Sequence, residues 1–363
     1  NVAIGEASLD AVTTGSDNTA VGDNAGGALT TGGNNVAIGS GALLVATTAA
    51  DNTAIGTLAL TANSSGTDNT AVGYAAGDAN TTGSDNTFIG DNAGGANTTA
   101  SNNTAVGSSA LLVNTTGTEN VAVGSQALIA NTTGDYNTGI GYTSLTANTT
   151  GERNNAVGYG TLAANTTASY NTAMGHSALY ANTTGASNTA FGNDALTANT
   201  TGTGSAAVGA NALDANTTGN YNVAVGQHAL GKNTTGANNI GIGYGSLSEI
   251  LTVDNNTAVG HIALTNSVGA NNTAVGSGAL TANTTGASGT AVGFDALKAV
   301  TTGGENTAVG RSSGEALTTG IRNVAIGGYA LYTATTVNSN TAVGYSALQT
   351  NAAADNTAVG RDA

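Results

Sequence analysis

A glycine recurs through the whole chain at an almost constant interval, and this period constrains the fold more than any other feature. It closes short apolar words such as Asn52–Gly56 and Asn306–Gly310. There are 22 such glycines; 19 of the 21 intervals equal the spacing between Gly39 and Gly56, and the other two are shorter by a single position. A fixed short period is typical of a solenoid, in which each repeat buries itself only by stacking on its neighbours. We therefore expect an all-β chain, with residues 1–363 forming one continuous β-solenoid of about 21 rungs rather than several globular domains.

Each rung reads N-T-A-V-G-x-x-A-L-x-A-N-T-T-G-x-x when it is numbered from its asparagine, as in residues 188–204. A few β-prone residues followed by glycine predict a short strand and a bend. Because side chains alternate along a strand, the second and fourth residues share one face and the third and fifth share the other. The fourth residue is apolar in every rung, and the ninth is Leu in 17 of 21 cases. We expect these two positions to form the core.

The opposite face of the predicted strand carries very small side chains. Its third residue is Ala in 19 of 22 rungs, with Phe88, Gly139 and Gly241 as the exceptions, and the fifth is always Gly. Such a surface allows another backbone to approach closely. Either a second segment of the same coil or another chain is expected to lie against it.

Two further features recur in the rungs: an opening asparagine and the word T-T-G, which predicts the turn between strands. Asn opens 20 of the 22 rungs. Stacked in register, these amides can form a ladder, or each can fix a turn through bonds to the backbone, and the sequence leaves both alternatives open. The word T-T-G, as in Thr132–Gly134, predicts a turn whose glycine has positive φ.

The words N-V-A-I-G and N-T-A-V-G resemble the head repeats of trimeric autotransporter adhesins of the YadA type, and the full-length rung is similar to repeats of phage tail fibres and bacterial surface fibres. The resemblance spans the whole chain. It implies a left-handed parallel β-roll, a homotrimer or homopolymer, an adhesive role towards a host-surface or matrix glycan or protein, and an extracellular, cell-surface or virion location. Family head repeats are usually shorter than the rung of this chain, which leaves the cross-section open.

Composition excludes several classes of partner. The net charge is −15 with only six Lys plus Arg, and nucleic acids and anionic lipids are bound through clustered cations. The chain has no Cys and no apolar stretch long enough to span a bilayer, so disulfides, thiolate sites and membrane insertion of this segment are not expected. Both termini lie within the repeat pattern, from which we expect a piece of a longer chain.

Catalysis, cofactors and metals are not expected. A repeated rung presents the same few side chains in lines, and no nucleophile pairs with a base. His176, His228 and His261 are two or three rungs apart without further ligands at suitable spacing, which favours exposed polar residues over a metal site.

Aromatic residues at the sixth position form an interrupted line beside the glycine bend. They are candidates for recognition of a sugar or a surface, with packing against loops as the alternative; the residues are Tyr74, Tyr142, Tyr159, Tyr244, Phe294 and Tyr345. Tyr142 and Tyr159 occupy adjacent rungs and are expected to stack. The irregular stretch Glu249–Gly276 is either a length change absorbed in a turn or a kink or docking spot.

Asparagine at the twelfth position starts a formal glycosylation sequon in twelve rungs. Examples are Asn63, Asn114, Asn182 and Asn283. Other rungs have Val, Leu or Ala at this place while Thr-Thr persists, which indicates a turn rather than a modification site. Glycosylation is therefore the lesser alternative.

These observations favour a structural extracellular fibre or filament segment with an adhesive role. The alternative is a ligand-binding solenoid for polysaccharide or ice, because Thr recurs at positions two, thirteen and fourteen. Adjacent Thr residues point in opposite directions along a strand, and Thr at position two alternates with Val and Ile as a core residue does. A depolymerase needs converging carboxylates, which the chain does not offer.

Overall fold

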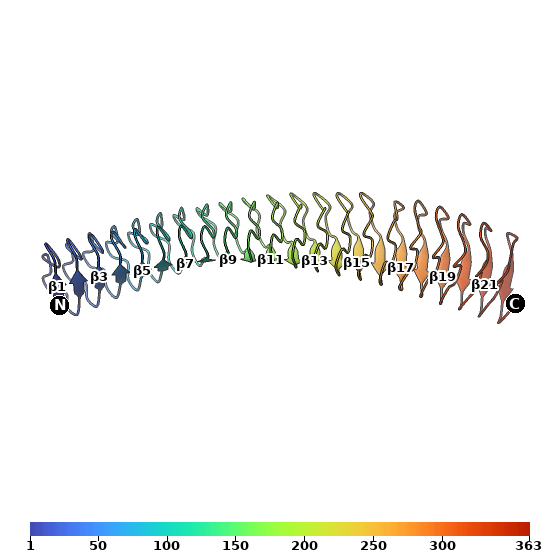
Figure 1. The fold of residues 1–363 in the computed structure, drawn as a ribbon, viewed down its shortest axis with the longest axis horizontal. Coiled ribbons are helices and arrows are strands. Elements are labelled where there is room, and N and C mark those ends of the chain that lie inside the picture. The colour runs from blue at the N-terminus through green and yellow to red at the C-terminus, as the bar shows by residue number, and fades with distance from the viewer. The chain divides into compact units, whose positions relative to one another are not determined.

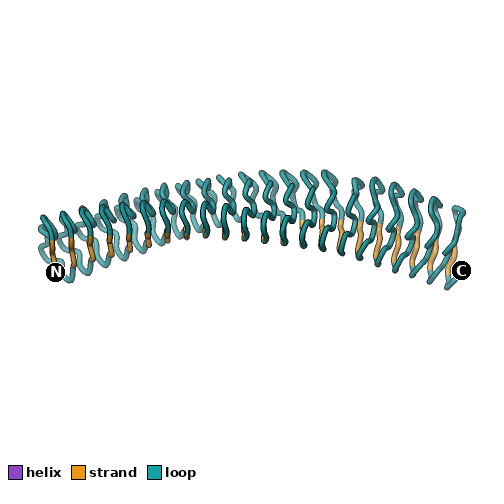
Figure 2. Tube along the Cα trace, viewed as in Figure 1, coloured by secondary structure: helices purple, strands orange, loops and turns teal.

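The computed structural model describes all residues from Asn1 to Ala363 and contains only β-strands, turns and loops. It comprises two compact units, Asn1–Thr184 and Gly185–Ala363. Within each unit every turn of the chain carries one short strand, and consecutive strands lie side by side (Figure 1). The strands take up only a small part of each turn, and the remainder is loop (Figure 2).

Each unit contains eleven strands. Those of the first unit are β1 (Val2–Ile4), β2 (Thr19–Val21), β3 (Val36–Ile38), β4 (Thr53–Ile55), β5 (Thr70–Val72), β6 (Thr87–Ile89), β7 (Thr104–Val106), β8 (Val121–Val123), β9 (Thr138–Ile140), β10 (Asn155–Val157) and β11 (Thr172–Met174). Those of the second unit are β12 (Thr189–Phe191), β13 (Ala206–Val208), β14 (Val223–Val225), β15 (Ile240–Ile242), β16 (Thr257–Val259), β17 (Thr273–Val275), β18 (Thr290–Val292), β19 (Thr307–Val309), β20 (Val324–Ile326), β21 (Thr341–Val343) and β22 (Thr357–Val359).

Consecutive strands within a unit pair in parallel, and equivalent rung positions lie opposite one another. Between β4 and β5, for example, Ala54 is paired with Ala71 and Ile55 with Val72. The same register holds between β18 and β19 in the second unit. One sequence period is therefore one turn of the coil, which confirms the predicted parallel β-solenoid and its repeat length.

Four positions of each rung have positive φ, which lets the chain turn sharply within few residues. Glycine at the fifth position has φ between 125° and 142°, a region that other residues rarely enter. The seventh and seventeenth positions also have positive φ, as does the ninth, where Leu adopts φ between 48° and 53°. The expected positive φ at Gly134 in the T-T-G word is wrong: Tyr136, at the seventeenth position, has φ 59° instead.

The expected core is only half correct. Leu at the ninth position is buried, as in Leu60, but the fourth residue of the rung points outward, and Ile55 is 37% exposed. The third residue, Ala54, is fully buried. The small face of the strand therefore packs inside its own coil, the first of the two alternatives, and the prediction that the fourth position belongs to the core is wrong. A coil with so short a repeat is narrow, and Leu together with two Ala fills its interior.

The exceptions in the core compensate one another in volume. Phe88 is fully buried at the third position, and the ninth positions beside it are Gly77 and Gly94. A Cβ added at Gly77 would lie 2.6 Å from Cδ2 of Phe88, so the ring occupies the space that Leu fills elsewhere. The leucines missing at Gly26 and Gly314 are compensated in volume in a different way. Leu29 and Leu317 are buried at the twelfth position of the same rungs.

Serine accompanies the two rungs that lack a third-position side chain. Gly139 and Gly241 each face a serine at the eighth position, where most rungs have Ala. A Cβ added at either glycine would lie 3.0 Å from the serine Oγ, in Ser144 and Ser246 respectively. Both hydroxyls donate to the backbone carbonyl of the glycine bend, at 3.1 and 3.0 Å. The hydroxyl therefore lies beside the space that the missing methyl leaves.

Asparagine at the first position fulfils both roles that the sequence leaves open. Oδ1 of Asn35 accepts a bond from the backbone N–H of Asn52 in the next rung at 3.1 Å. Nδ2 of Asn52 donates to Oδ1 of Asn35 and to the carbonyl of Gly66. The amides thus form a ladder along the coil and hold the T-T-G turn at the same time, which satisfies buried polar groups on both sides of the line.

Candidate recognition surface

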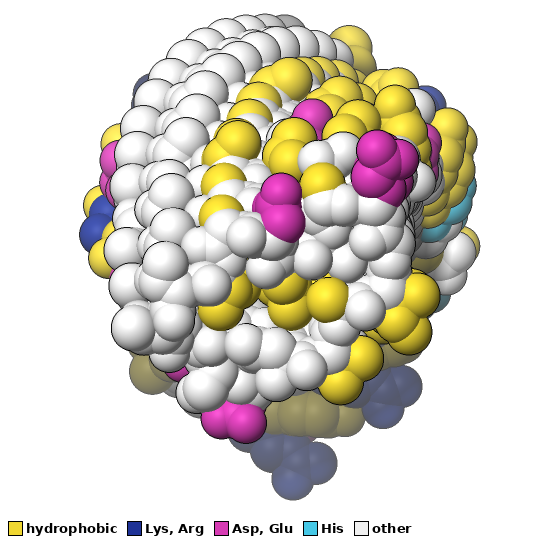
Figure 3. Space-filling view, turned by 90° about the vertical axis from the view of Figure 1, so that its left-hand side faces the viewer, with side chains coloured by type: hydrophobic (Ala, Val, Ile, Leu, Met, Phe, Trp, Pro, Cys, Tyr) yellow, Lys and Arg dark blue, Asp and Glu magenta, His cyan; other side chains and the backbone are white.

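The sixth position places its side chain on the outside of the coil, directly after the glycine bend. All six aromatic residues named from the sequence lie there, and their exposed fractions are between 49% and 55%. Tyr74, Tyr142 and Tyr159 belong to the first unit, and Tyr244, Phe294 and Tyr345 belong to the second. Because each rung repeats the same path, side chains of one kind follow one another in rows, as the end-on view of Figure 3 shows for hydrophobic side chains.

In the first unit, three rings of adjacent rungs form a stack. The centroids of Tyr142 and Tyr159 are 5.7 Å apart at an interplanar angle of 23°, which confirms the expected contact. The ring of His176 continues the stack at 5.0 Å from Tyr159 and 7°. Both ring faces of Tyr159 are therefore covered by its neighbours, and mainly ring edges remain open to solvent.

In the second unit, Tyr244 has a comparable stacked histidine but different surroundings. Its ring lies 5.6 Å from His261 at 15°, and His228 meets it edge-on at 6.3 Å and 88°. Tyr345 contacts Tyr329 at 5.7 Å and 79°, and the guanidinium of Arg361 lies 5.7 Å from the Tyr345 centroid. The sequence did not indicate these partners, because they occupy the seventh position or are not tyrosine or phenylalanine.

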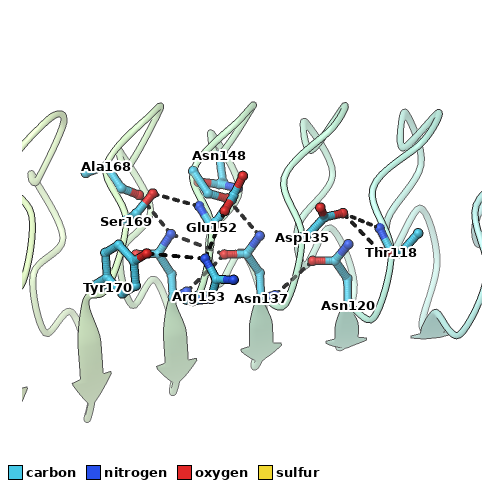
Figure 4. A network of polar contacts seen from close by, with 12 residues as sticks. Thr118, Asn120, Asp135, Asn137, Asn148, Glu152, Arg153, Ala168, Ser169 and Tyr170 are labelled. Atoms are coloured by element: carbon cyan, nitrogen blue, oxygen red, sulfur yellow. Dashed lines mark hydrogen bonds and ion pairs between the residues drawn. The ribbon is translucent and has the colours of Figure 1, made fainter.

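A second exposed line lies at the seventeenth position, and its residues are not among those predicted from the sequence. Arg153 is placed between Tyr136 and Tyr170, with its guanidinium carbon 5.0 and 5.6 Å from the two ring centroids. Its Nη1 also donates to Glu152 and to the hydroxyl of Tyr170 (Figure 4). The recurrence of Tyr at this position was the available signal. Such cation–π contacts hold adjacent rungs together at the surface.

Acidic and hydroxyl side chains at the sixteenth position join neighbouring rungs beside that line. Oδ1 of Asp135 accepts bonds from the backbone and the hydroxyl of Thr118, at 2.6 and 3.2 Å. The hydroxyl of Ser169 accepts from the backbone N–H of Glu152 at 3.0 Å (Figure 4). These side chains therefore link neighbouring rungs along this side of the coil. Their accepting oxygens already have donors within the chain.

The second unit has a surface hollow beside Tyr244. It has a volume of about 360 Å³ and is lined by Asp214, His228, Gly231, Lys232, Tyr244, Gly245, Ser248, Glu249 and Ile262. Lys232 and Glu249 form an ion pair.

Burial raises the pKa of the Asp214 carboxyl, against the opposing effects of two backbone N–H groups and His228. Glu249 and Ile262 of the irregular stretch line this hollow. β16 and β17 still pair in register on either side of the shortened rung, so the length change is absorbed in the turn between them.

The twelfth-position asparagines lie inside the coil. Asn63, Asn114, Asn182 and Asn283 are at most 1% exposed. Nδ2 of Asn114 donates to Asn97 in the preceding rung and to the carbonyl of Gly117. A glycan on this nitrogen would have to displace these bonds, so the geometry disfavours the glycosylation alternative.

This interior ladder is interrupted where an apolar residue replaces Asn. Ile250 and Val300 are buried at the twelfth position of the rungs that follow Asn233 and Asn283. Oδ1 of each of these two asparagines is buried and has no hydrogen-bond partner. The next rung there offers no amide, which explains the unpaired atoms.

The three histidines take part in ring contacts, and no group of three or more His, Cys, Asp or Glu side chains is arranged to hold a metal ion. The chain has no helix with the length and apolar character that crossing a membrane requires. Neither a protein-family model nor a curated protein matches the sequence.

Proposed function

We propose that this chain is a non-enzymatic structural segment of an extracellular fibre, which associates with further copies of itself and displays recognition side chains on its surface. The single observation that carries the proposal is the outward face of the strands. In both units the fourth position presents an apolar side chain to solvent, as Ile89 and Ile242 do with exposed fractions of 39% and 38%.

This outward strand face, made of the second and fourth positions, contains no charged residue in any rung, although the chain carries a net charge of −15. Contiguous uncharged apolar surface is rare on monomers and typical of interfaces. A partner copy offers the same uncharged face, so neither copy would have to bury a charge on association. The resemblance to trimeric adhesin repeats supports three copies and an adhesive role on a cell or virion surface.

The test is the mass of the full chain in solution, measured by analytical ultracentrifugation over a range of concentrations. We expect about three times the 34.6 kDa of one chain. Ile55→Lys combined with Ile89→Lys should shift the mass to that of the monomer, because lysines on this face would be buried unpaired. The matched control is Thr116→Lys, at an exposed position away from the face. A wild-type chain that stays monomeric throughout contradicts the proposal.

A second candidate, binding of ice or another ordered surface, is favoured by the position of the strand threonines. The second position of four successive rungs is Thr53, Thr70, Thr87 and Thr104, which begin β4 to β7 and lie on the outward face. These threonines therefore do not belong to the core, contrary to the interpretation of the sequence. The threonines at position thirteen are less suitable, because their hydroxyls donate to the next rung, as Thr81 does at 3.0 Å. Inhibition of ice recrystallisation by the wild-type chain would favour this candidate, and absence of inhibition would contradict it.

A further inference from the structure

The hollow beside Tyr244 exists because two rung positions lack the side chains that fill them elsewhere. Gly231 occupies the tenth position, where other rungs have residues such as Thr146 or Ile129. Gly245 occupies the seventh position with φ 60°. A Cβ at Gly231 would lie 3.4 Å from Oδ1 of Asp214, so even a small side chain there would enter the space in front of the carboxylate.

The walls of the hollow combine an apolar side with a polar side. Tyr244, whose side chain is 52% exposed, and Ile262 form the apolar part. Asp214, Ser248 and the paired Lys232 and Glu249 supply hydrogen-bond acceptors and donors. A sugar ring likewise combines apolar and polar parts, with C–H groups on its faces and hydroxyls around its edge. Binding sites of this kind are concave, with few polar groups that fix orientation.

The charge of the hollow selects among sugars. The Lys232 ammonium is neutralised by Glu249, which leaves the Asp214 carboxylate as an acceptor for donor groups. Burial leaves the ionised form of this carboxyl incompletely solvated, which raises its pKa. Hydroxyl donors of a ligand would stabilise the carboxylate by replacing the missing water. An acidic sugar would instead place a second negative charge beside it.

We propose that this hollow binds one or two neutral sugar units of a glycan, with Ile262 and the open edge of the Tyr244 ring beside the C–H groups of the sugar and Asp214 accepting bonds from vicinal hydroxyls. The inference rests on the proposed display role and assigns it a ligand class and a site. The volume of about 360 Å³ limits the site to a small saccharide. The equivalent position in the first unit, Tyr159, has a stacked histidine and equal exposure, 52%, but has no carboxylate at the tenth or eleventh position of its own or the two preceding rungs.

The experiment measures binding of N,N′-diacetylchitobiose, lactose and 3′-sialyllactose to the full chain by saturation-transfer NMR and calorimetry. We expect a neutral disaccharide to bind with a dissociation constant on the order of 1 mM, as a shallow, solvent-open site allows, and the sialylated sugar to bind at least fivefold more weakly than lactose. Asp214→Asn and Tyr244→Ala should each weaken binding of the neutral sugar at least fivefold. Tyr159→Ala is the matched control and should leave it unchanged.

Gly231→Thr provides a test that does not depend on deleting a side chain. Threonine occurs at the tenth position of other rungs, so this variant should fold with an unchanged denaturation midpoint while its side chain fills the hollow and abolishes binding. Failure of the full chain to bind any neutral disaccharide at saturating concentration, preference for the sialylated sugar, or undiminished binding by Gly231→Thr overturns the inference. The sedimentation mass is measured on the same samples. An intact oligomer without sugar binding refutes the site alone, whereas a monomer refutes the proposed self-association.

Discussion

The third and fourth positions of each rung are neighbours in sequence and carry mostly apolar residues, but one side chain is buried and the other lies outside. In β7 the methyl of Ala105 is fully buried, whereas Val106 lies on the outward face. Hydrophobicity alone would place valine inside and leave alanine to the surface. The difference shows that in a coil this narrow, side-chain volume decides what the interior accepts. The larger apolar residue is left outside, where it becomes available to a partner.

The largest expected effect comes from emptying the most crowded part of the interior. Phe88→Ala should lower the free energy of unfolding by about 3–5 kcal/mol, because Gly77 and Gly94 leave nothing to fill the space of the ring. The measurement is chemical denaturation followed by circular dichroism. Loss of a similar amount from Phe191→Ala, at the outward fourth position, would contradict the distinction between the two faces.

Restoring the consensus leucine sharpens the same test. Gly94 has φ 62°, close to the values that Leu adopts at this position in other rungs. Gly94→Leu alone should destabilise, because its side chain overlaps Phe88, but it should recover part of the stability of Phe88→Ala. Strictly additive effects of the two substitutions would show that Phe88 and Gly94 do not share one space.

An intermediate effect is expected from the interior amide ladder. Asn131→Ala removes donor bonds to Asn114 and to the carbonyl of Gly134, both at 2.9 Å, and the acceptor for Asn148 at 2.8 Å. Leaving these groups buried and unpaired should cost about 1–3 kcal/mol. The control is Thr133→Ala at the exposed fourteenth position of the same turn. Equal denaturation midpoints for the two variants would argue that the ladder contributes nothing beyond ordinary turn bonds.

A small effect is expected on the outward face. Val106→Thr should change the stability of the separated chain by less than about 0.5 kcal/mol, because its side chain gains little burial within the coil. Ala105→Val, one residue earlier, should cost about 1–3 kcal/mol through overpacking. Thermal denaturation of both variants in the background of the two outward lysines keeps association out of the comparison. A larger loss from Val106→Thr than from Ala105→Val would reverse the assignment of the faces.

The period alone was sufficient to predict the parallel solenoid, its rung length and the register of its strands, because stacking identical words allows no other pairing. It could not decide which strand face is inward. Alternation gives two faces but not their orientation, and the positive φ values of the ninth-position leucines, which set how the coil closes, have no signature in the residue type. The compensation between Phe88 and its two glycines was visible in the sequence as coincident exceptions, and it was the available signal that the third position is inside.

The candidate recognition surface was predictable only where it follows the repeat. The exposed sixth-position line and the stacking of Tyr142 on Tyr159 follow from identical positions in adjacent rungs. The hollow beside Tyr244 depends on Asp214 and Gly231, which lie one or two rungs away at a different position of the turn. Contacts between unlike positions require the path of the loops, which the pattern does not specify.

The smallest expected effect is a dependence of stability on pH at the tenth position. Burial raises the pKa of the Asp78 carboxyl, against opposing bonds from the backbone N–H groups of Asp78 and Ala79. The folded chain therefore binds this proton more tightly than the unfolded chain. The stabilisation is fully present below the unfolded pKa of 3.8 and is lost as the pH rises through the folded pKa. The denaturation midpoint of wild type relative to that of Asp78→Asn should thus fall as the pH rises above 3.8. Thr116→Ala, which removes no ionisable group, should give a constant difference. A rise of the wild-type midpoint relative to that of Asp78→Asn over the same range would contradict the prediction. It would mean that the backbone hydrogen bonds to the Asp78 carboxylate outweigh the effect of its burial.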